Sequence, residues 1–274
     1  MDAGGSGLGL GIVGCGQLGG AIAGALLRAD VVAPGELWIC NRSGPAGELA
    51  VHEGVHWTRD PQELAARCAS VLLALPPAAG RLLRLEAPDR LVVSVMAGID
   101  TGQLRAIGNS ARVVRAISNP AAAIGLAYSP WFAPGGLSPP DRATVLRLFE
   151  ACGTTDEVPA ESQIDCFTAL TGPVPGFVAY FAECMQAYAQ GQGVEPDVAA
   201  RGVRQLFLAA GRMMAASDTP PAGFVQEMVD YAGTTAAGLE AMRASPLSWL
   251  VAEGLEAARR RCLTIGAEPP APDA

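Results

Sequence analysis

The sequence contains no lysine, so the 19 basic residues among its 274 residues are all arginine. Without a lysine amine, the protein cannot form a Schiff base with a carbonyl substrate or use an ammonium group as a general acid. A Tyr-x-x-x-Lys pair that would protonate a ketone oxygen is excluded for the same reason.

Histidine is almost as rare, since the chain has only His52 and His56. Their spacing could bind a metal if both lay on one face of a helix, but Gly54 between them breaks a helix, and no cluster of carboxylates or thiols accompanies them. They also stand before the third strand-like segment, away from the expected place of a substrate. We therefore expect neither a metal site nor a catalytic histidine.

Long apolar runs, basic clusters and cysteine pairs are missing too. No run of about eighteen apolar residues is present, and the first residues lack the pattern of a secretory signal, so we expect no membrane span.

The 27 acidic residues exceed the 19 basic ones, and the net charge of -8 argues against a nucleic-acid partner. The seven cysteines form no C-x-x-C pair, which is typical of free thiols in a reducing compartment. We expect a cytoplasmic protein whose partners are small molecules or other protein chains.

Short apolar runs alternate with helical patterns in the first part of the chain. The strand-like runs are LGIVG, ELWICN, SVLLALP and LVVSVMA. Such alternation predicts βαβ units and a parallel sheet. After Pro159 the segments are long, alanine-rich and helical in period. We predict an α/β domain over residues 1–158 and an all-helical domain over residues 159–274.

One predicted helix, which contains FVAYFAECMQAYA, is apolar on nearly every face. A helix of this kind is buried, either against a second copy of the chain or at the centre of a monomeric bundle. We favour the first arrangement and expect a homodimer or a higher homo-oligomer.

The segment GIVGCGQLGG has the spacing of a dinucleotide-binding loop. Gly14 allows the tight turn, Gly16 lets the backbone approach a pyrophosphate, and Gly19 permits close packing of strand and helix. The helix that begins near Gln17 and Leu18 directs its free N–H groups to the anion. We predict a Rossmann-like domain; a glycine-rich turn without a ligand is the alternative.

The end of the second strand-like run indicates which nicotinamide cofactor is bound. An acidic residue there would bind the ribose 2′-hydroxyl of NADH, whereas an arginine accommodates the 2′-phosphate of NADPH. This chain has Asn41, Arg42 and Ser43, and no acid before Glu48. We expect the Arg42 guanidinium to pair with the phosphate and its two neighbours to add hydrogen bonds, which favours NADPH.

The shortage of proton donors favours an imine over a ketone as the group that is reduced. A cyclic imine can enter the site already protonated, so the protein needs only to place its carbon against the nicotinamide and to hold its anionic group. We therefore expect an NAD(P)H-dependent oxidoreductase that acts on a C=N bond. A β-hydroxyacid-type dehydrogenase shares the first domain but should carry a catalytic lysine, which is absent.

Over essentially its whole length the chain resembles pyrroline-5-carboxylate reductase. The matching segments, in order, are GCGQLG, NRS, LLALPP, VVSVMAGI, VVRAISNPAA, ESQIDCFTALTG and GTTAAGL. The last is the most specific, because the family has Gly-Gly-Thr-Thr-x-x-Gly-Leu there. The resemblance implies the NADPH-dependent reduction of 1-pyrroline-5-carboxylate to L-proline in proline biosynthesis. It also implies an interleaved helical dimerisation domain, with each active site formed where one subunit's cofactor meets helices of the dimer.

The resemblance also implies roles for individual residues. Further cofactor-binding positions are Ala74, Pro76, Ala97, Gly98 and Asn119. The substrate-binding positions are Thr171, Asp230, Gly233, Thr234 and Thr235. Backbone N–H groups of the Gly-Thr-Thr turn hold the substrate carboxylate, and Thr235, the expected catalytic residue, approaches the ring nitrogen. Helix capping by Thr234 and Thr235 is the alternative explanation of these threonines.

Several positions depart from the family pattern. The family's Ser-Gly-Ser-Gly-Pro-Ala-Tyr is Thr-Gly-Pro-Val-Pro-Gly-Phe here, from Thr171 to Phe177, and its Ser-Pro-Gly before Gly-Thr-Thr is Asp230-Tyr231-Ala232. An aspartate opposes a carboxylate ligand unless it points away into solvent at the end of its helix. A reductase of another cyclic imine, or a catalytically silent NADP-binding relative, therefore remains an alternative.

Overall fold

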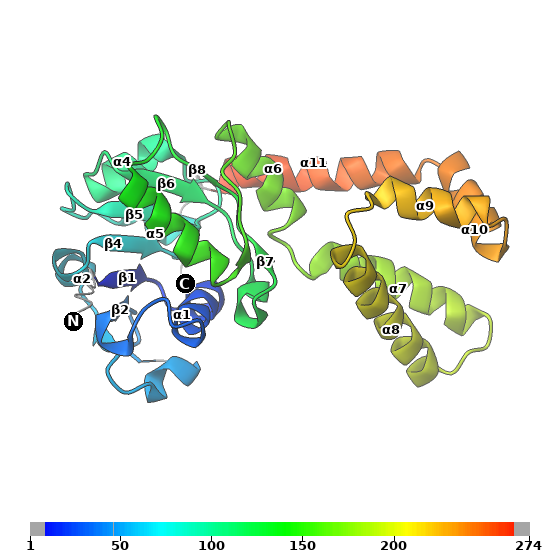
Figure 1. Cartoon of the computed structure of the whole chain (residues 1–274), viewed down its shortest axis with the longest axis horizontal. Coiled ribbons are helices and arrows are strands. Elements are labelled where there is room, and N and C mark those ends of the chain that lie inside the picture. Colours follow the sequence, from blue (N-terminus) through cyan, green and yellow to red (C-terminus); the bar gives the residue numbers. More distant parts are fainter. Residues whose placement is uncertain (1–8, 46, 266–274) are drawn as a thin grey trace, which may run out of the picture. The chain divides into compact units, whose positions relative to one another are not determined.

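A seven-stranded sheet organises the first part of this computed structural model, which describes residues 9–45 and 47–265 (Figure 1). The strands are β1 (Leu10–Val13), β2 (Leu37–Cys40), β3 (His56–Thr58), β4 (Ser70–Leu73), β5 (Leu91–Ser94), β6 (Val113–Ala116) and β8 (Trp131–Phe132). Their order is β3-β2-β1-β4-β5-β6-β8, and all pairs are parallel except β6 with β8. This is the doubly wound order of a dinucleotide-binding domain, as the sequence predicts.

The strands form where apolar residues follow one another without alternation. All four residues of β1, β4, β5 and β6 are buried, as expected for parallel strands covered on both faces. The predicted strands β1, β2, β4 and β5 are confirmed. The sequence analysis did not predict β3, which is short and partly polar, or β6, which contains Arg115.

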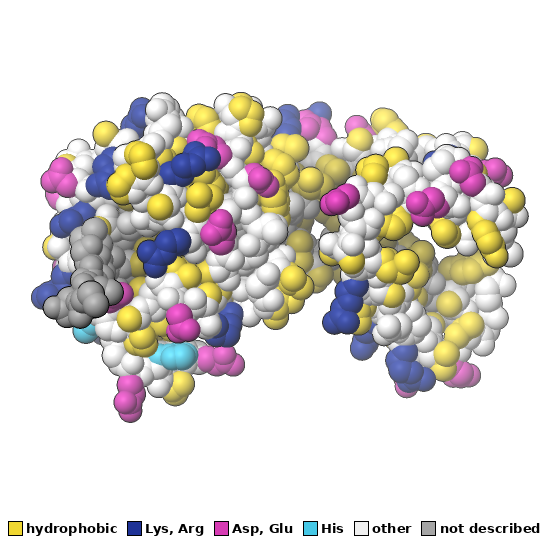
Figure 2. All heavy atoms as spheres, in the orientation of Figure 1, with side chains coloured by type: hydrophobic (Ala, Val, Ile, Leu, Met, Phe, Trp, Pro, Cys, Tyr) yellow, Lys and Arg dark blue, Asp and Glu magenta, His cyan; other side chains and the backbone are white. Residues whose placement is uncertain are grey.

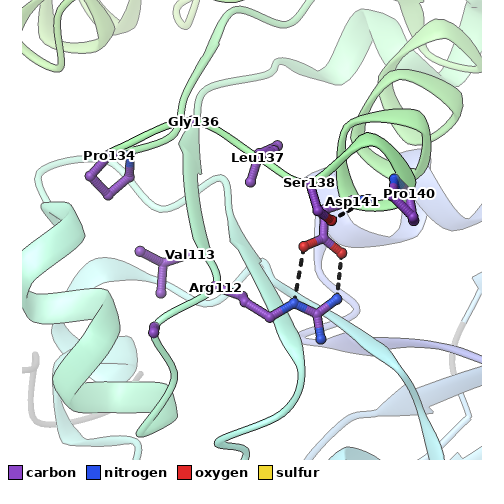
Figure 3. A pocket seen from close by; sticks show the side chains of 9 residues that line it. Arg112, Val113, Pro134, Gly136, Leu137, Ser138, Pro140 and Asp141 are labelled. Carbon is purple, nitrogen blue, oxygen red and sulfur yellow. Dashed lines mark hydrogen bonds and ion pairs between the residues drawn. The ribbon is translucent and has the colours of Figure 1, made fainter.

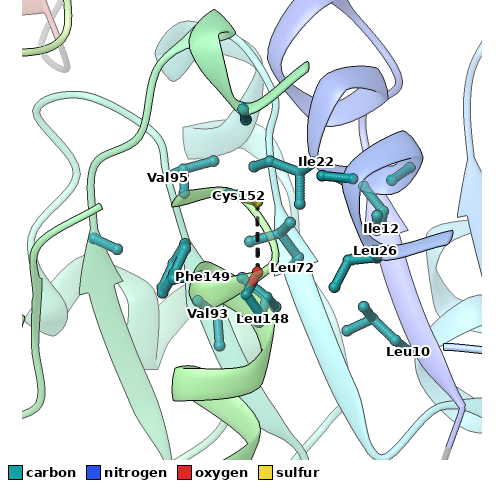
Figure 4. Close-up of a cluster of buried hydrophobic side chains, with 14 of the residues drawn as sticks. Leu10, Ile12, Ile22, Leu26, Leu72, Val93, Val95, Leu148, Phe149 and Cys152 are labelled. Carbon is teal, nitrogen blue, oxygen red and sulfur yellow. Dashed lines mark hydrogen bonds between the residues drawn. The ribbon is translucent and has the colours of Figure 1, made fainter. Parts of the chain in front are cut away.

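Helices cover both faces of the sheet. Those of this region are α1 (Gln17–Arg28), α2 (Pro61–Arg67), α3 (Pro77–Leu82), α4 (Thr101–Gly108), α5 (Pro139–Glu150) and α6 (Ser162–Leu170), with short 3₁₀ turns η1 (Pro34–Glu36), η2 (Gly47–Val51) and η3 (Pro120–Ile124). Side chains from α1 and α5, among them Ile22, Leu26 and Phe149, are buried with strand residues in one core (Figure 4). A second core on the other face holds Leu64 of α2 and Leu104 of α4. A small parallel pair, β7 (Ala127–Tyr128) and β9 (Gly153–Thr154), completes this region.

The chain divides into two compact units that do not follow the predicted boundary between residues 158 and 159. One unit extends to Pro173 and resumes at Ala257, and the other is Val174–Glu256. Helix α6 belongs to the first unit, because Glu161 and Asp165 pair with Arg115 of β6. The predicted order, a parallel-sheet region followed by a helical region, is confirmed.

The second unit consists of helices. They are α7 (Gly176–Gly191), α8 (Pro196–Ala215), α9 (Pro221–Asp230), α10 (Thr234–Ala244) and the first part of α11 (Leu247–Ile265). Within the described chain, Ala199 and Ala236 are its only buried hydrophobic residues, and large side chains such as Tyr188, at 73 % exposure, lie on its surface (Figure 2). Helix α7 has no buried residue, so this unit does not enclose it as the centre of a bundle. Most of the stability of a helix in water comes from packing of an apolar face, and large exposed apolar surfaces are typical of interaction sites.

None of the helices in residues 9–45 and 47–265 is long and apolar enough to cross a membrane.

Candidate functional site

The predicted dinucleotide loop joins β1 to α1, and its close packing explains two of its glycines. Gly14 has φ +101° and donates its N–H to the Cys40 oxygen at 2.9 Å. A Cβ on Gly14 would lie 2.7 Å from the Ala74 oxygen, and one on Gly19 would lie 1.9 Å from the Gly14 oxygen. Any side chain at either position would force the strand and the helix apart.

Gly16 is different, because a Cβ there would meet nothing within 4 Å. It is the N-cap of α1 and makes no side-chain capping bond, so the first N–H groups of the helix, at Gln17 and Leu18, need another partner. A cavity of about 300 Å³ adjoins the loop, between α1 and the turn that holds Glu48 and His52. Open space, uncapped N–H groups and the helix dipole fit a pyrophosphate.

The sheet order brings the predicted cofactor residues to one edge. The strand order reverses at β1, which lies between β2 and β4. The residues that follow the carboxyl ends are Gly14 and Gly16 after β1, Asn41, Arg42 and Ser43 after β2, Ala74 and Pro76 after β4, Ala97 and Gly98 after β5, and Asn119 after β6. In open parallel sheets, ligands bind outside the carboxyl ends at such a reversal.

The turn after β2 is held by the Asn41 side chain. Its Nδ2 donates to the Ser43 Oγ at 3.2 Å and to the Gly44 oxygen at 2.8 Å. These bonds leave the side chains of Arg42 and Ser43 exposed at the edge of the sheet. Asn41 thus shapes the turn, and its predicted bond to the cofactor phosphate stays a prediction.

The turns after β5 and β6 each have a defined local conformation. Gly98 has φ +70°, a conformation that favours glycine. Asn119 is buried and its Oδ1 accepts the Ala121 N–H at 3.0 Å, so it caps η3. Both turns are therefore fixed in shape, which suits a surface that receives a rigid ring.

The Gly-Thr-Thr turn lies in the second unit, at the start of α10. Gly233 is the N-cap and makes no side-chain capping bond, while Thr234 and Thr235 are the first two helical residues and are exposed. The alternative that a threonine side chain caps this helix at the N-cap position is wrong. The first N–H groups of α10 are available to an anion, and the preceding Ala232 reaches this geometry with φ +57°.

Asp230 is exposed at the end of α9, and its Oδ1 accepts from the Gln226 Nε2 at 2.8 Å. The carboxylate is thus bonded to the preceding turn of its own helix. Thr171 lies in the first unit, at the C-cap of α6, and its hydroxyl donates to the Phe167 oxygen at 2.9 Å. Each side chain therefore makes one hydrogen bond within its own helix.

A second cavity, of about 380 Å³, lies near the amino end of β6, at the opposite edge from the dinucleotide loop (Figure 3). Arg112 and Asp141 line it and form a fork: Arg112 Nε donates to Asp141 Oδ2 at 3.0 Å and Nη2 donates to Oδ1. Its charged groups satisfy each other, so this cavity offers no reactive group.

The hydrogen bonds from Arg112 lower the pKa of the Asp141 carboxyl. A depressed folded-state pKa stabilises the protein above the unfolded value of about 3.9, and the benefit is lost as the pH falls through the folded value. Because Arg112 is 43 % exposed, we expect Asp141→Asn to cost only about 1 kcal/mol at pH 7. Urea unfolding should show this loss of stability relative to the wild type at pH 7 and a smaller loss at pH 3. Asp218→Asn, at an exposed site, is the control; an equal loss at both pH values would contradict the assignment.

His52 lines the cavity beside the dinucleotide loop, whereas His56 does not. His56 stacks on Trp38, with ring centroids 4.6 Å apart, and its Nε2 lies 3.1 Å from the Gly35 oxygen. Over the described part of the chain, no three histidine, cysteine or acidic residues gather as metal ligands.

Arg115, to which no role was predicted, is buried in β6 and pairs with Asp165 of α6. The sequence did contain an indication of this ion pair. A charged residue interrupts the apolar run VVRAI, and a buried parallel strand tolerates a charge only if an oppositely charged partner accompanies it. Its partners Glu161 and Asp165 lie in ESQID, far along the chain.

Comparisons with known proteins agree with this architecture. The family model for pyrroline-5-carboxylate reductase dimerisation matches residues 161–265, and that for NADP oxidoreductase coenzyme F420-dependent matches residues 9–98. Pyrroline-5-carboxylate reductase of Thermus thermophilus is 31 % identical over 262 residues, which cover 94 % of this chain and 98 % of the relative. That of Escherichia coli is 30 % identical over 244 residues, covering 85 % and 88 %.

Solved structures show the same fold. The crystal structure of Plasmodium falciparum pyrroline carboxylate reductase with NADP bound superposes with a TM-score of 0.77 at 24 % identity, and covers 94 % of this chain and 98 % of that one. The two matches to curated reductases extend over nearly the whole of both partners, from the dinucleotide loop to the helical unit. The chain therefore belongs to the pyrroline-5-carboxylate reductase family.

Proposed function

We propose that this protein reduces 1-pyrroline-5-carboxylate to L-proline with NADPH. The observation that carries the proposal is a pair of uncapped helix N-termini in one chain, α1 at Gly16 and α10 at Gly233. The first suits the pyrophosphate of a dinucleotide, and the second suits the carboxylate of a small acid. The curated relatives that match nearly the whole chain carry the name of this reductase, which supports the same substrate.

NADPH, when bound, supplies the hydride. The loop residues Gly14, Gly16, Gln17, Leu18 and Gly19 would hold its pyrophosphate. The exposed Arg42 and Ser43 would receive the 2′-phosphate. Ala74, Pro76, Ala97, Gly98 and Asn119 would surround the rest of the cofactor along the same sheet edge. The NADP reported for the Plasmodium relative supports this choice.

The Gly233–Thr235 turn would bind the substrate. Its backbone N–H groups would hold the carboxylate, and the Thr235 hydroxyl would accept a hydrogen bond from the protonated ring nitrogen. Asp230 remains a proposed substrate-site residue, and its bond to Gln226 supports a carboxylate held against its own helix. Thr171 remains a proposed substrate contact. The relatives favour this substrate over another cyclic imine or a silent NADP-binding role.

The test of this function is the reaction itself. Addition of pyrroline-5-carboxylate to purified protein with NADPH should oxidise the cofactor and yield an equal amount of proline. NADPH binding without oxidation would reject the proposal and favour the silent relative.

Thr235→Val should lower kcat by about 10- to 100-fold, because it removes a positioned hydrogen-bonding group from the proposed ring-nitrogen contact but keeps the shape. Steady-state kinetics with pyrroline-5-carboxylate measure the effect. Thr264→Val, at an exposed threonine near the end of α11, is the matched control and should behave as the wild type. Unchanged turnover in the Thr235 variant would remove this residue from the mechanism.

Arg42→Ala should raise the KM for NADPH by about tenfold or more and leave that for NADH nearly unchanged, because only NADPH has the 2′-phosphate. Both KM values are measured on the wild type and the variant. Arg105→Ala removes an equal charge from the exposed face of α4 and should change neither value. Equal use of both cofactors by the wild type would contradict the assignment.

We further propose that the protein acts as a homodimer or higher homo-oligomer in the cytoplasm. The exposed apolar surface of the helical unit and the match to a dimerisation family support the assembly. The seven cysteines are all free, which agrees with a reducing compartment. Sedimentation over a range of concentrations tests the assembly, and a monomer throughout would refute it.

A further inference from the structure

One arginine lies buried within the sheet at the strand that leads to Asn119. Arg115 of β6 has only 4 % of its surface exposed. A buried charge is costly unless it is paired and hydrogen-bonded. Arg115 Nη1 donates to Glu161 Oε1 at 3.3 Å, and its Nη2 donates to Asp165 Oδ1. These three residues form an ion cluster in the first unit.

The carboxylates of the ion cluster bind two further segments. Glu161 accepts from the Thr101 N–H at 2.7 Å and from the Thr101 hydroxyl at 2.8 Å, and Thr101 opens α4 shortly after Gly98. Asp165 accepts from the Cys262 Sγ at 3.5 Å. Burial, and then the Asp165 carboxylate, raise the pKa of that thiol, so it remains a protonated donor. The ion cluster thereby ties β6, α4, α6 and the end of α11 together.

The elements that the ion cluster joins are continuous along the chain with residues of the proposed site. From β6 the chain continues through Ile117 to Asn119, and Ile117 is buried in a small apolar cluster with residues of α6. At the other end of α6, the N–H and hydroxyl of Thr171 donate to the Phe167 oxygen at 2.8 and 2.9 Å. Because Thr171 is bonded to α6, a shift of α6 relative to the sheet would move Thr171 relative to Gly98 and Asn119.

We propose that the ion cluster is a positioning device that fixes the place of Thr171 relative to Gly98 and Asn119. A guanidinium fork shared by two carboxylates has a defined geometry, whereas an apolar contact between a helix and a strand permits sliding. The inference rests on the proposed function in so far as Thr171 is assigned to the substrate and the other two residues to NADPH.

The test removes one charge of the ion cluster without changing its shape, in Asp165→Asn. Hydrogen exchange of the ligand-free protein and steady-state kinetics are measured at a temperature at which circular dichroism shows a folded variant. We expect exchange at Thr171 and Gly172 to quicken by about tenfold, and the KM for pyrroline-5-carboxylate to rise by about tenfold. The Kd of NADPH should stay within about twofold, because the loop at Gly16 belongs to a different part of the sheet edge.

Glu157→Gln is the matched control. Glu157 precedes α6 and pairs with the partly exposed Arg142 outside the ion cluster, so both readouts should match the wild type. If Asp165→Asn does not fold, Glu161→Gln is judged by the same measurements.

A lower melting temperature with unchanged exchange at Thr171 and an unchanged KM would show a merely structural role and overturn the inference. Hydrogen exchange needs no substrate. It therefore tests the ion cluster even if the wild type fails to reduce the imine, a result that would reject only the proposed function.

Discussion

Gly16→Val should raise the Kd of NADPH by at least about 100-fold, because it removes access to two or more N–H groups that would bind the pyrophosphate. A Cβ at this position meets no protein atom within 4 Å, so the branch point of the new side chain meets no clash in the folded protein. The space that it fills is the one proposed for the ligand. Loss of the favourable glycine N-cap costs only about 1 kcal/mol of stability.

Fluorescence titration with NADPH measures the loss of binding, and thermal unfolding without ligand measures the loss of stability. Gly35→Val is the matched control, since a Cβ there also meets nothing within 4 Å and the residue does not line the cavity, so it should preserve binding. Gly19→Ala should lose both binding and stability, because its Cβ would lie 1.9 Å from the Gly14 oxygen. Undiminished NADPH binding by the folded Gly16 variant would place the cofactor elsewhere.

Arg115→Met should lower the free energy of unfolding by about 3–5 kcal/mol, the usual cost of removing one partner from a buried ion pair. Methionine fills a similar volume, but it leaves the Asp165 carboxylate, 10 % exposed, without its cation. Glu161, at 27 %, retains Thr101 as a partner and some contact with water. The loss of the Asp165 pair should therefore dominate.

Urea unfolding at one fixed protein concentration, followed by circular dichroism, measures this loss. Glu63→Gln breaks an ion pair between side chains that are 58 % and 44 % exposed, and should cost less than about 1 kcal/mol. A similar small loss for Arg115→Met would mean that water or a rearranged carboxylate compensates the missing guanidinium. The variant concerns stability alone, so it is independent of the kinetic test of the ion cluster.

The sheet could be predicted only where its strands lack charges. Apolar runs and the glycine spacing indicated β1, β2, β4 and β5, because parallel strands buried on both faces are continuously apolar. The strand β6 was missed since Arg115 interrupts its run, and local patterns carry no information about partners far along the chain. The edge strand β3, with His56 exposed, has no apolar pattern to detect.

The residues of the candidate site could be predicted where the strand topology alone brings them together. Parallel strands end at one edge, so residues after their carboxyl ends meet there whatever lies between them. The side-chain bonds were not predictable. Asn41 holds its own turn and Asp230 bonds to Gln226. Both bonds depend on the local backbone conformation, which the sequence pattern does not specify. The position of Gly233 at the N-cap, one residue before the threonines, depends on where α10 begins, and helix ends are the least certain feature of a sequence pattern.

The helical unit has Ala199 and Ala236 as the only buried hydrophobic residues among those described, so the proposed association of copies would make the protein's stability depend on its own concentration. When the surface that covers such helices is supplied by another copy, folding and association share one equilibrium, and dilution alone can unfold the unit. Its melting temperature is then a property of the solution as well as of the chain. A cell that makes too little of this protein would lose the Gly-Thr-Thr turn before it loses the sheet.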